Sequence, residues 1–106
     1  MAQGIYWARG RISGRADVAF GSIGASNSQI IANGDGDFLD IYTTLNQDVI
    51  LTITNRFGET HEYEVAASRG GVMLPFTHKG AISVRHNGVA ATSGKLIVQS
   101  VNAGEF

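Results

Sequence analysis

The clearest structural signal in the chain lies in residues 48–66, DVILTITNRFGETHEYEVA. Every second residue over 49–53 is a large apolar side chain, as expected for a strand with one buried face. Residues 55–58 follow as a turn, and their glycine can adopt a positive φ. Alternation resumes over 59–66, so the sequence predicts a β-hairpin.

The same alternation recurs along most of the chain between short segments that contain glycine. Fourteen glycines and one proline interrupt the sequence, so few segments reach the length of a typical helix. Further strands are predicted over residues 37–44, 72–76, 81–86 and 95–102, with weaker candidates at 5–8, 16–20 and 29–32. Asn87-Gly88 is a turn signal of the kind that joins the two strands of a hairpin.

This pattern of about seven to nine short strands predicts an all-β fold, a single antiparallel β-sandwich or jelly-roll-like domain. The strand order stays open between a jelly roll and an immunoglobulin-like arrangement. A chain of 106 residues has the size of one domain, so residues 1–106 are expected to share one core. Residues 1–28 are either two irregular edge strands and a loop or an N-terminal arm that reaches onto a neighbour.

Composition excludes several classes of protein. A hydrophobic fraction of 43% excludes a disordered chain, and the absence of cysteine excludes disulfides and thiol catalysis. No apolar segment approaches the length of a transmembrane helix, so no membrane partner is expected. Residues 1–11 lack the apolar core of a secretion signal.

Charge is unevenly distributed, although the formal net charge is only −1. Residues 33–64 carry seven carboxylates against one arginine, whereas the segments on either side are basic. The balanced total favours no nucleic-acid partner. The charges either pair within one molecule or form complementary faces between molecules. In the second case the expected partner-binding residues are Trp7, Arg9, Arg11 and Arg15 in the arm and Asp35, Asp37 and Asp40 in the acidic segment.

Two patterns resemble metal sites without meeting their requirements. Residues 33–37, Asn-Gly-Asp-Gly-Asp, place oxygen ligands at alternate positions, as the start of a calcium loop does. The sixth and twelfth positions of an EF-hand loop would be Phe38 and Thr44, where glycine and glutamate are required. A tight turn is therefore the preferred interpretation. The three histidines lack the spacing of a zinc site, so neither a metal nor another cofactor is expected.

Catalytic motifs are incomplete as well. Residues 24–28, Gly-Ala-Ser-Asn-Ser, lack the final glycine of a nucleophile elbow. Glu62 and Glu64 lie two residues apart on one strand face, which is typical of a solvated sheet. A non-enzymatic protein is therefore favoured over a small hydrolase. Tyr6 and Trp7 leave open a small carbohydrate- or peptide-binding β-sandwich module.

In its general character the chain resembles the small all-β structural proteins of tailed phages, in particular capsid decoration, or cement, proteins. The shared features are the Met1-Ala2 start without a signal segment, the absence of cysteine, the strands separated by glycines and the 16% of charged residues. The resemblance implies a homo-oligomer, with a trimer favoured, that clamps the subunits of a protein lattice by avidity. It also implies a virion component that is assembled in the host cytoplasm.

Overall fold

Eight strands and one turn of 3-10 helix make up the described part of the chain, residues 11–32, 34–75 and 77–102 of a computed structural model. The strands are β1 (Arg11–Ala19), β2 (Ser28–Ile31), β3 (Phe38–Thr43), β4 (Val49–Thr54), β5 (Thr60–Val65), β6 (Gly70–Leu74), β7 (Ile82–His86) and β8 (Lys95–Asn102). The 3-10 helix η2 spans Phe20–Ser22. Within the described residues no helix is long and apolar enough to cross a membrane.

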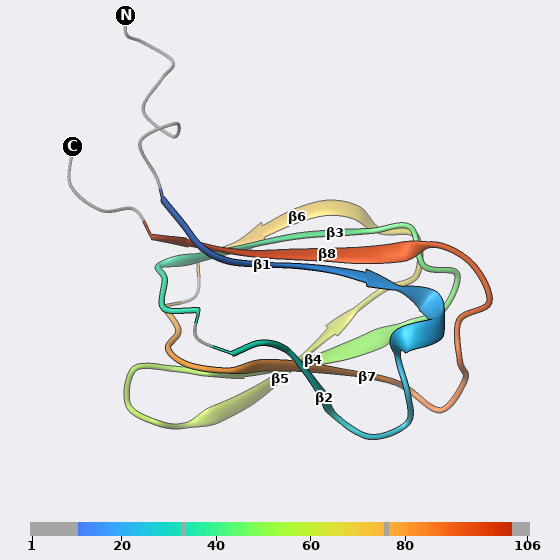
Figure 1. Cartoon of the computed structure of the whole chain (residues 1–106), viewed down its shortest axis with the longest axis horizontal. Coiled ribbons are helices and arrows are strands. Elements are labelled where there is room, and N and C mark those ends of the chain that lie inside the picture. The colour runs from blue at the N-terminus through green and yellow to red at the C-terminus, as the bar shows by residue number, and fades with distance from the viewer. Residues whose placement is uncertain (1–10, 33, 76, 103–106) are drawn as a thin grey trace, which may run out of the picture.

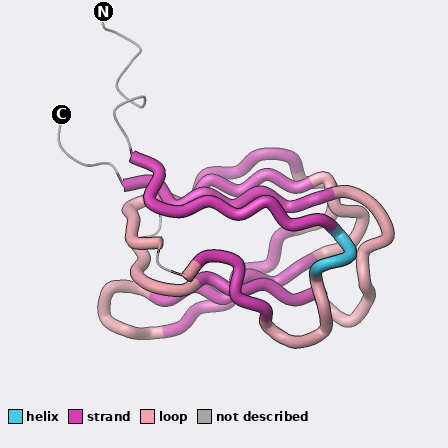
Figure 2. The backbone as a smooth tube through the Cα atoms, viewed as in Figure 1, coloured by secondary structure: helices cyan, strands magenta, loops and turns pink. Residues whose placement is uncertain are grey.

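The strands form two antiparallel sheets of four, ordered β1-β8-β3-β6 and β2-β7-β4-β5. Figure 1 shows these sheets as an upper and a lower layer, and the loops that join the layers lie at their two ends (Figure 2). Apart from β4 and β5, each pair of consecutive strands is divided between the two sheets. The predicted all-β sandwich is therefore confirmed, and the strand order, which the sequence left open, is that of a jelly roll. In an immunoglobulin-like sandwich the first strand pairs with other neighbours.

The core lies between the two layers and is built from alternate residues of each strand. In β4 the apolar residues predicted to share one face, Val49, Leu51 and Ile53, are all buried. The central strands β3 and β8 add Leu39, Ile41, Leu96 and Val98, and β7 adds Ile82 and Val84. Burial of such side chains is the main favourable contribution to folding.

The hairpin predicted over residues 48–66 is present as β4 and β5. The register pairs Ile53 with His61 and Thr54 with Thr60, and Gly58 in the turn has a φ of +85°. The segments predicted as strands at 37–44, 72–76, 81–86 and 95–102 overlap β3, β6, β7 and β8. Period-two alternation therefore located these strands correctly.

The expected hairpin at Asn87-Gly88 is wrong. Strand β7, which ends before this turn, pairs with β2 and β4, whereas β8 belongs to the other sheet. Gly88 has a φ of +94°, and its backbone N–H donates to the Nδ1 atom of His86 over 3.1 Å. The turn is thus local, and residues 89–94 then carry the chain across to the second layer.

The N-terminal segment is more regular than its sequence indicates. Residues 11–19 form the long edge strand β1, of which the candidate at 16–20 covered only the end. The pairing of β1 with β8 shifts register between Ile12 and Gly14, and this irregularity disrupts the alternation. The candidate at 5–8 lies outside the described residues.

Candidate functional site

The outer face of the β1-β8-β3-β6 sheet presents apolar side chains to solvent. Residues that are paired across a sheet share one face, so the register places Ile12, Val101 and Phe38 in one row. Another row places Ile97 beside Tyr42. Ile12 is 59% exposed and Tyr42 is 45% exposed. Large apolar groups are therefore accessible at both ends of this face.

Charged side chains lie between these apolar rows. The middle row runs from Arg15 through Gln99 and Asp40 to Met73, which is 55% exposed. The Arg15 guanidinium lies 3.3 Å from a carboxylate oxygen of Asp17, and both side chains remain about half exposed. We call this surface the docking face; it comprises Ile12, Arg15, Asp17, Phe38, Asp40, Tyr42, Met73, Ile97, Gln99 and Val101.

The outer face of the β2-β7-β4-β5 sheet differs in character, because its side chains are mainly polar. Thr52 lies at its centre, paired with Ser83 on one side and Glu62 on the other. The Glu62 carboxylate accepts a hydrogen bond from Arg85 over 3.3 Å. Water and neighbouring side chains satisfy the polar groups of such a face. A substitution on it is therefore a suitable control for a substitution on the docking face.

The structure brings together some of the partner-binding residues that the sequence suggested. Arg15 on β1 and Asp40 on β3 lie in one row of the docking face, separated only by Gln99. Arg11 begins β1 and pairs with Asn102 of β8. The two predictions nearest the N-terminus, Trp7 and Arg9, lie outside the described residues.

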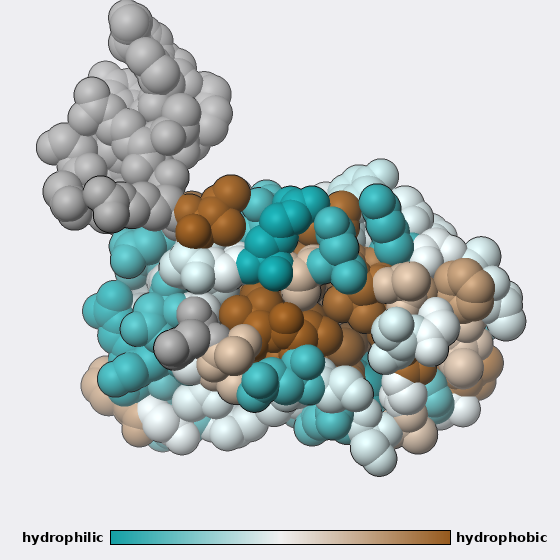
Figure 3. Space-filling view, viewed as in Figure 1, coloured by the Kyte–Doolittle hydropathy of each residue, from teal (hydrophilic) through white to brown (hydrophobic). Residues whose placement is uncertain are grey.

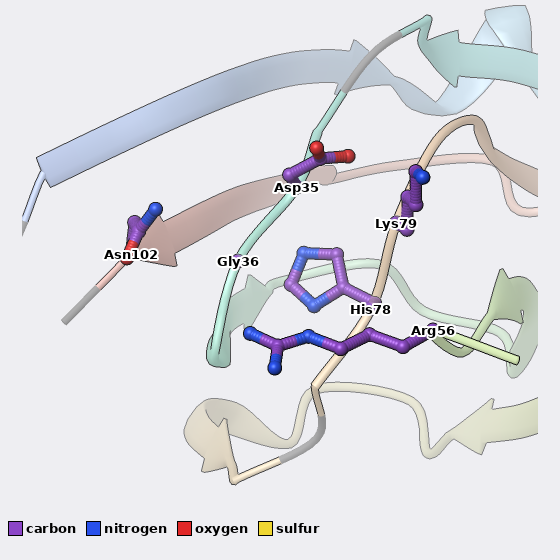
Figure 4. A pocket seen from close by; sticks show the side chains of 6 residues that line it. All are labelled: Asp35, Gly36, Arg56, His78, Lys79 and Asn102. Carbon is purple, nitrogen blue, oxygen red and sulfur yellow. The ribbon is translucent and has the colours of Figure 1, made fainter. Parts of the chain in front are cut away.

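Asp35 and Asp37 lie apart from the docking face, in the loop between β2 and β3. This loop borders a polar pocket of about 360 Å³, shown in Figure 4, which is lined by Asp35, Gly36, Arg56, His78, Lys79 and Asn102. His78 is buried within it, and its Nε2 atom lies 2.8 Å from the hydroxyl oxygen of Ser100. One of these two groups donates to the other, depending on the imidazole tautomer.

The acidic side chains of this loop tie neighbouring segments together. Asp35 accepts a hydrogen bond from the backbone N–H of Gly80 over 3.1 Å, and Asp37 lies 3.1 Å from the Arg56 guanidinium. Among residues 11–32, 34–75 and 77–102, no three His, Cys, Asp or Glu side chains gather as metal ligands would. The hydrogen bond of Asp35 holds the β2–β3 loop against the segment before β7, and the ion pair of Asp37 holds it against the β4–β5 turn.

A second opening lies along the side where β1 and β2 form the sheet edges. Figure 3 shows a band of hydrophobic residues there, bordered above and below by polar ones. A cavity of about 300 Å³ includes Ala16, Val18 and Ile30 in its lining. Ala16 and Val18 belong to the core, so this opening is the exposed margin of the core between two edge strands.

Sequence reasoning missed the apolar half of the docking face. In β3 the partly buried Phe38 and the exposed Tyr42 alternate with the buried Leu39, Ile41 and Thr43, so they lie on the outer face. Alternation could not show that β3 and β6 are neighbours, which sets Met73 beside Asp40. The face thus depends on strand order, which no local pattern contains.

Comparisons with known proteins support the fold and leave the activity open. No family model matches the chain, and no curated protein matches it either. A structure of Pseudomonas aeruginosa AlgX is similar, with a TM-score of 0.58 and 7% sequence identity. The likeness covers 84% of this chain and 26% of the AlgX chain, so this chain spans about a quarter of AlgX. Fold and site together define a jelly-roll sandwich with one mixed apolar and charged outer face.

Proposed function

We propose that this protein is a non-enzymatic structural assembly protein, whose docking face joins copies of the chain. The particular form that the sequence resemblance suggests is a virion component of the capsid decoration type, docked on a protein lattice. The observation that carries the proposal is the docking face itself, where exposed Tyr42, Met73 and Ile12 surround charges of both signs.

The chemistry of the docking face suits contact between folded proteins. Tyrosine, methionine and arginine are enriched at protein interfaces, and the face contains Tyr42, Met73 and Arg15. Arg15 and Asp40 lie on different strands of the same row. A second copy related by a two-fold axis can therefore set its Asp40 opposite Arg15, and the same pair then forms twice.

The shape of the site favours a protein partner over a small ligand. Jelly rolls serve viral capsids and lectins alike, so the fold by itself supports both classes. Small-molecule sites are concave and enclose most of their ligand. The docking face is an open sheet surface, which suits a second flat surface instead. A carbohydrate- or peptide-binding module is the competing hypothesis.

The test is the solution mass by light scattering after size exclusion, at two protein concentrations and two salt concentrations. We expect an oligomer well above the 11.2 kDa of one chain, and two-fold pairing of the docking face favours an even number of copies over the trimer that the resemblance implied. Tyr42→Lys should lower that mass, because it places a charge among apolar side chains that become buried. Thr52→Lys, at the centre of the opposite sheet, is the matched control and should leave the mass unchanged.

Two results would overturn the proposal. The first is a single chain at every concentration and salt level. The second is an oligomer whose mass Tyr42→Lys does not alter while circular dichroism shows the variant to be folded. Binding of the single chain to free oligosaccharides on a glycan array would instead support the carbohydrate-binding alternative.

A further inference from the structure

The turn between β4 and β5 presents a phenylalanine almost entirely to solvent. Phe57 is 88% exposed, more than any other large hydrophobic residue in the described part of the chain. Figure 1 shows this turn, in yellow-green, projecting at the end of the sandwich from which the strands β1 and β8 leave. A single exposed apolar residue needs no explanation in general. The structure around Phe57 makes this one unusual.

Asn55 holds the turn in one conformation. Its Oδ1 atom accepts hydrogen bonds from the backbone N–H groups of Phe57 over 2.9 Å and of Glu59 over 3.0 Å. Its side-chain amide donates to the Glu59 carboxylate over 2.9 Å, and its backbone carbonyl accepts from Gly58 over 3.1 Å. The backbone of Phe57 is therefore ordered before any partner arrives, which reduces the entropy that binding must remove.

The residue before Phe57 fixes the turn to the rest of the molecule. The Arg56 guanidinium lies 3.1 Å from the Asp37 carboxylate in the β2–β3 loop. The Arg56 side chain is nevertheless 63% exposed, so part of its cationic group remains accessible. Phe57 thus projects from a turn that is held at its base and flanked by a positive charge.

The same hairpin contributes to a cavity of matching character. Between the edge strands β5 and β6 a cavity of about 300 Å³ is lined by Ile53, His61, Glu62, Tyr63, Leu74 and Pro75. An apolar cavity of roughly 150 Å³ is enough to take up benzene, so a phenyl ring fits this volume. Tyr63 can meet that ring edge to face. Glu62 also borders the cavity, and its carboxylate, 56% exposed, pairs with Arg85 of the same chain on the outer face of the sheet.

We propose that Phe57 of one chain inserts into this cavity of a second copy. Phe57 and the cavity lie on one hairpin, so a two-fold axis beside it lets both copies insert at once. The Arg56 of one copy, 63% exposed, then lies near Glu62 of the other, whose carboxylate remains 56% exposed beside its own Arg85, so the charges across the contact are complementary. The inference rests on the self-association proposed above, but it uses a surface separate from the docking face.

Mutation of Phe57 tests the contact without disturbing the fold, because its side chain touches little within its own chain. We expect Phe57→Ala to raise the dissociation constant of this contact by about 10- to 100-fold, the effect of burying one large aromatic side chain. Phe57→Trp should retain most of the affinity. Val89→Ala removes another loop residue, 58% exposed, and should have no effect.

Sedimentation velocity on the full chain, Tyr42→Lys, Phe57→Ala and the double variant separates the two proposals. We expect each single variant to lower the mass partly and the double variant to give 11.2 kDa. If only Tyr42→Lys lowers the mass, the Phe57 contact is wrong and the docking face stands. If only Phe57→Ala lowers it, the docking face is wrong. If neither does, both proposals fail.

The absence of native cysteine allows a direct proximity test. An Arg56→Cys chain is mixed with a Pro75→Cys chain that carries a mass tag, under mild oxidation. The proposal expects a disulfide between the two different chains, because residue 56, next to Phe57, and residue 75, at the cavity, meet across the contact. It also expects Phe57→Ala in the first chain to remove most of that product. If no disulfide forms while Phe57 is present, or if the disulfide still forms in the Phe57→Ala chain, the proposed insertion is contradicted.

Discussion

Two glycines share one backbone conformation but have different surroundings. Gly88 and Gly94 both have a φ of +94°, a value that side-chain-bearing residues rarely adopt. A Cβ atom at Gly88 would meet nothing within 4 Å, whereas one at Gly94 would lie 2.2 Å from the carbonyl oxygen of Thr44. The loop before β8 passes so close to the end of β3 that only hydrogen fits.

Alanine at the two glycines therefore separates conformational strain from steric overlap. We expect Gly88→Ala to lower the free energy of unfolding by about 1 kcal/mol, the cost of a positive φ. Gly94→Ala should lower it by about 3 kcal/mol or more, because backbone must also move. Urea unfolding followed by circular dichroism measures both changes. Equal losses at the two positions would show that the close approach to Thr44 is absent.

At the scale of the element, the β4–β5 hairpin depends on one asparagine. Asn55 satisfies backbone groups on both sides of the turn, and its side-chain nitrogen also lies 3.2 Å from the Nε2 atom of His61. Asn87, in contrast, makes a side-chain hydrogen bond to Glu64 on the solvated sheet face. Both asparagines lie in turns, but Asn55 is partly buried and contacts more neighbours than the exposed Asn87 does.

We expect Asn55→Ala to lower the free energy of unfolding by about 1–3 kcal/mol, because it removes the acceptor of two backbone N–H groups. Asn87→Ala should cost about 1 kcal/mol or less. Chemical denaturation gives both values. Asn55→Ala should also weaken self-association, since Phe57 is then held less firmly. An Asn55→Ala protein as stable as the Asn87→Ala control would contradict the ordering role.

For individual strands, the sequence predicts position and buried face, but it does not predict which strands become neighbours. Alternation is a local property, so it located β4 and β5 and the buried face of β4 correctly. It failed at β1, where the bulge beside Gly14 interrupts the pattern, and at Asn87-Gly88, where a correct turn signal joins strands of different sheets. The docking face and the exposure of Phe57 follow from strand order and packing, which a single sequence does not reveal.

At the scale of the whole molecule, the fold joins segments that are distant in the chain. β1 pairs with β8 along their length, and β3 pairs with β6 and β8. Among the pairings between described strands, only β4 with β5 is a hairpin between consecutive strands. In the other pairings, a long loop must close and lose chain entropy before the stabilising contacts between the strands form.

Folding should accordingly be slow for a domain of this size. We expect refolding in water to take milliseconds to seconds, as for other all-β sandwiches dominated by distant pairings. Stopped-flow fluorescence across a urea series measures this rate, using a variant that does not self-associate. Refolding in microseconds would be incompatible with the jelly-roll strand order.

The pairing of Arg11 with Asn102 also determines how the molecule responds to force. Because β1 and β8 are antiparallel and leave the sandwich side by side, tension applied at these residues pulls the two strands apart from one end. The hydrogen bonds then break one pair after another, as a zipper opens, instead of sharing the load. A copy held through its broad sheet surface would escape this weakness.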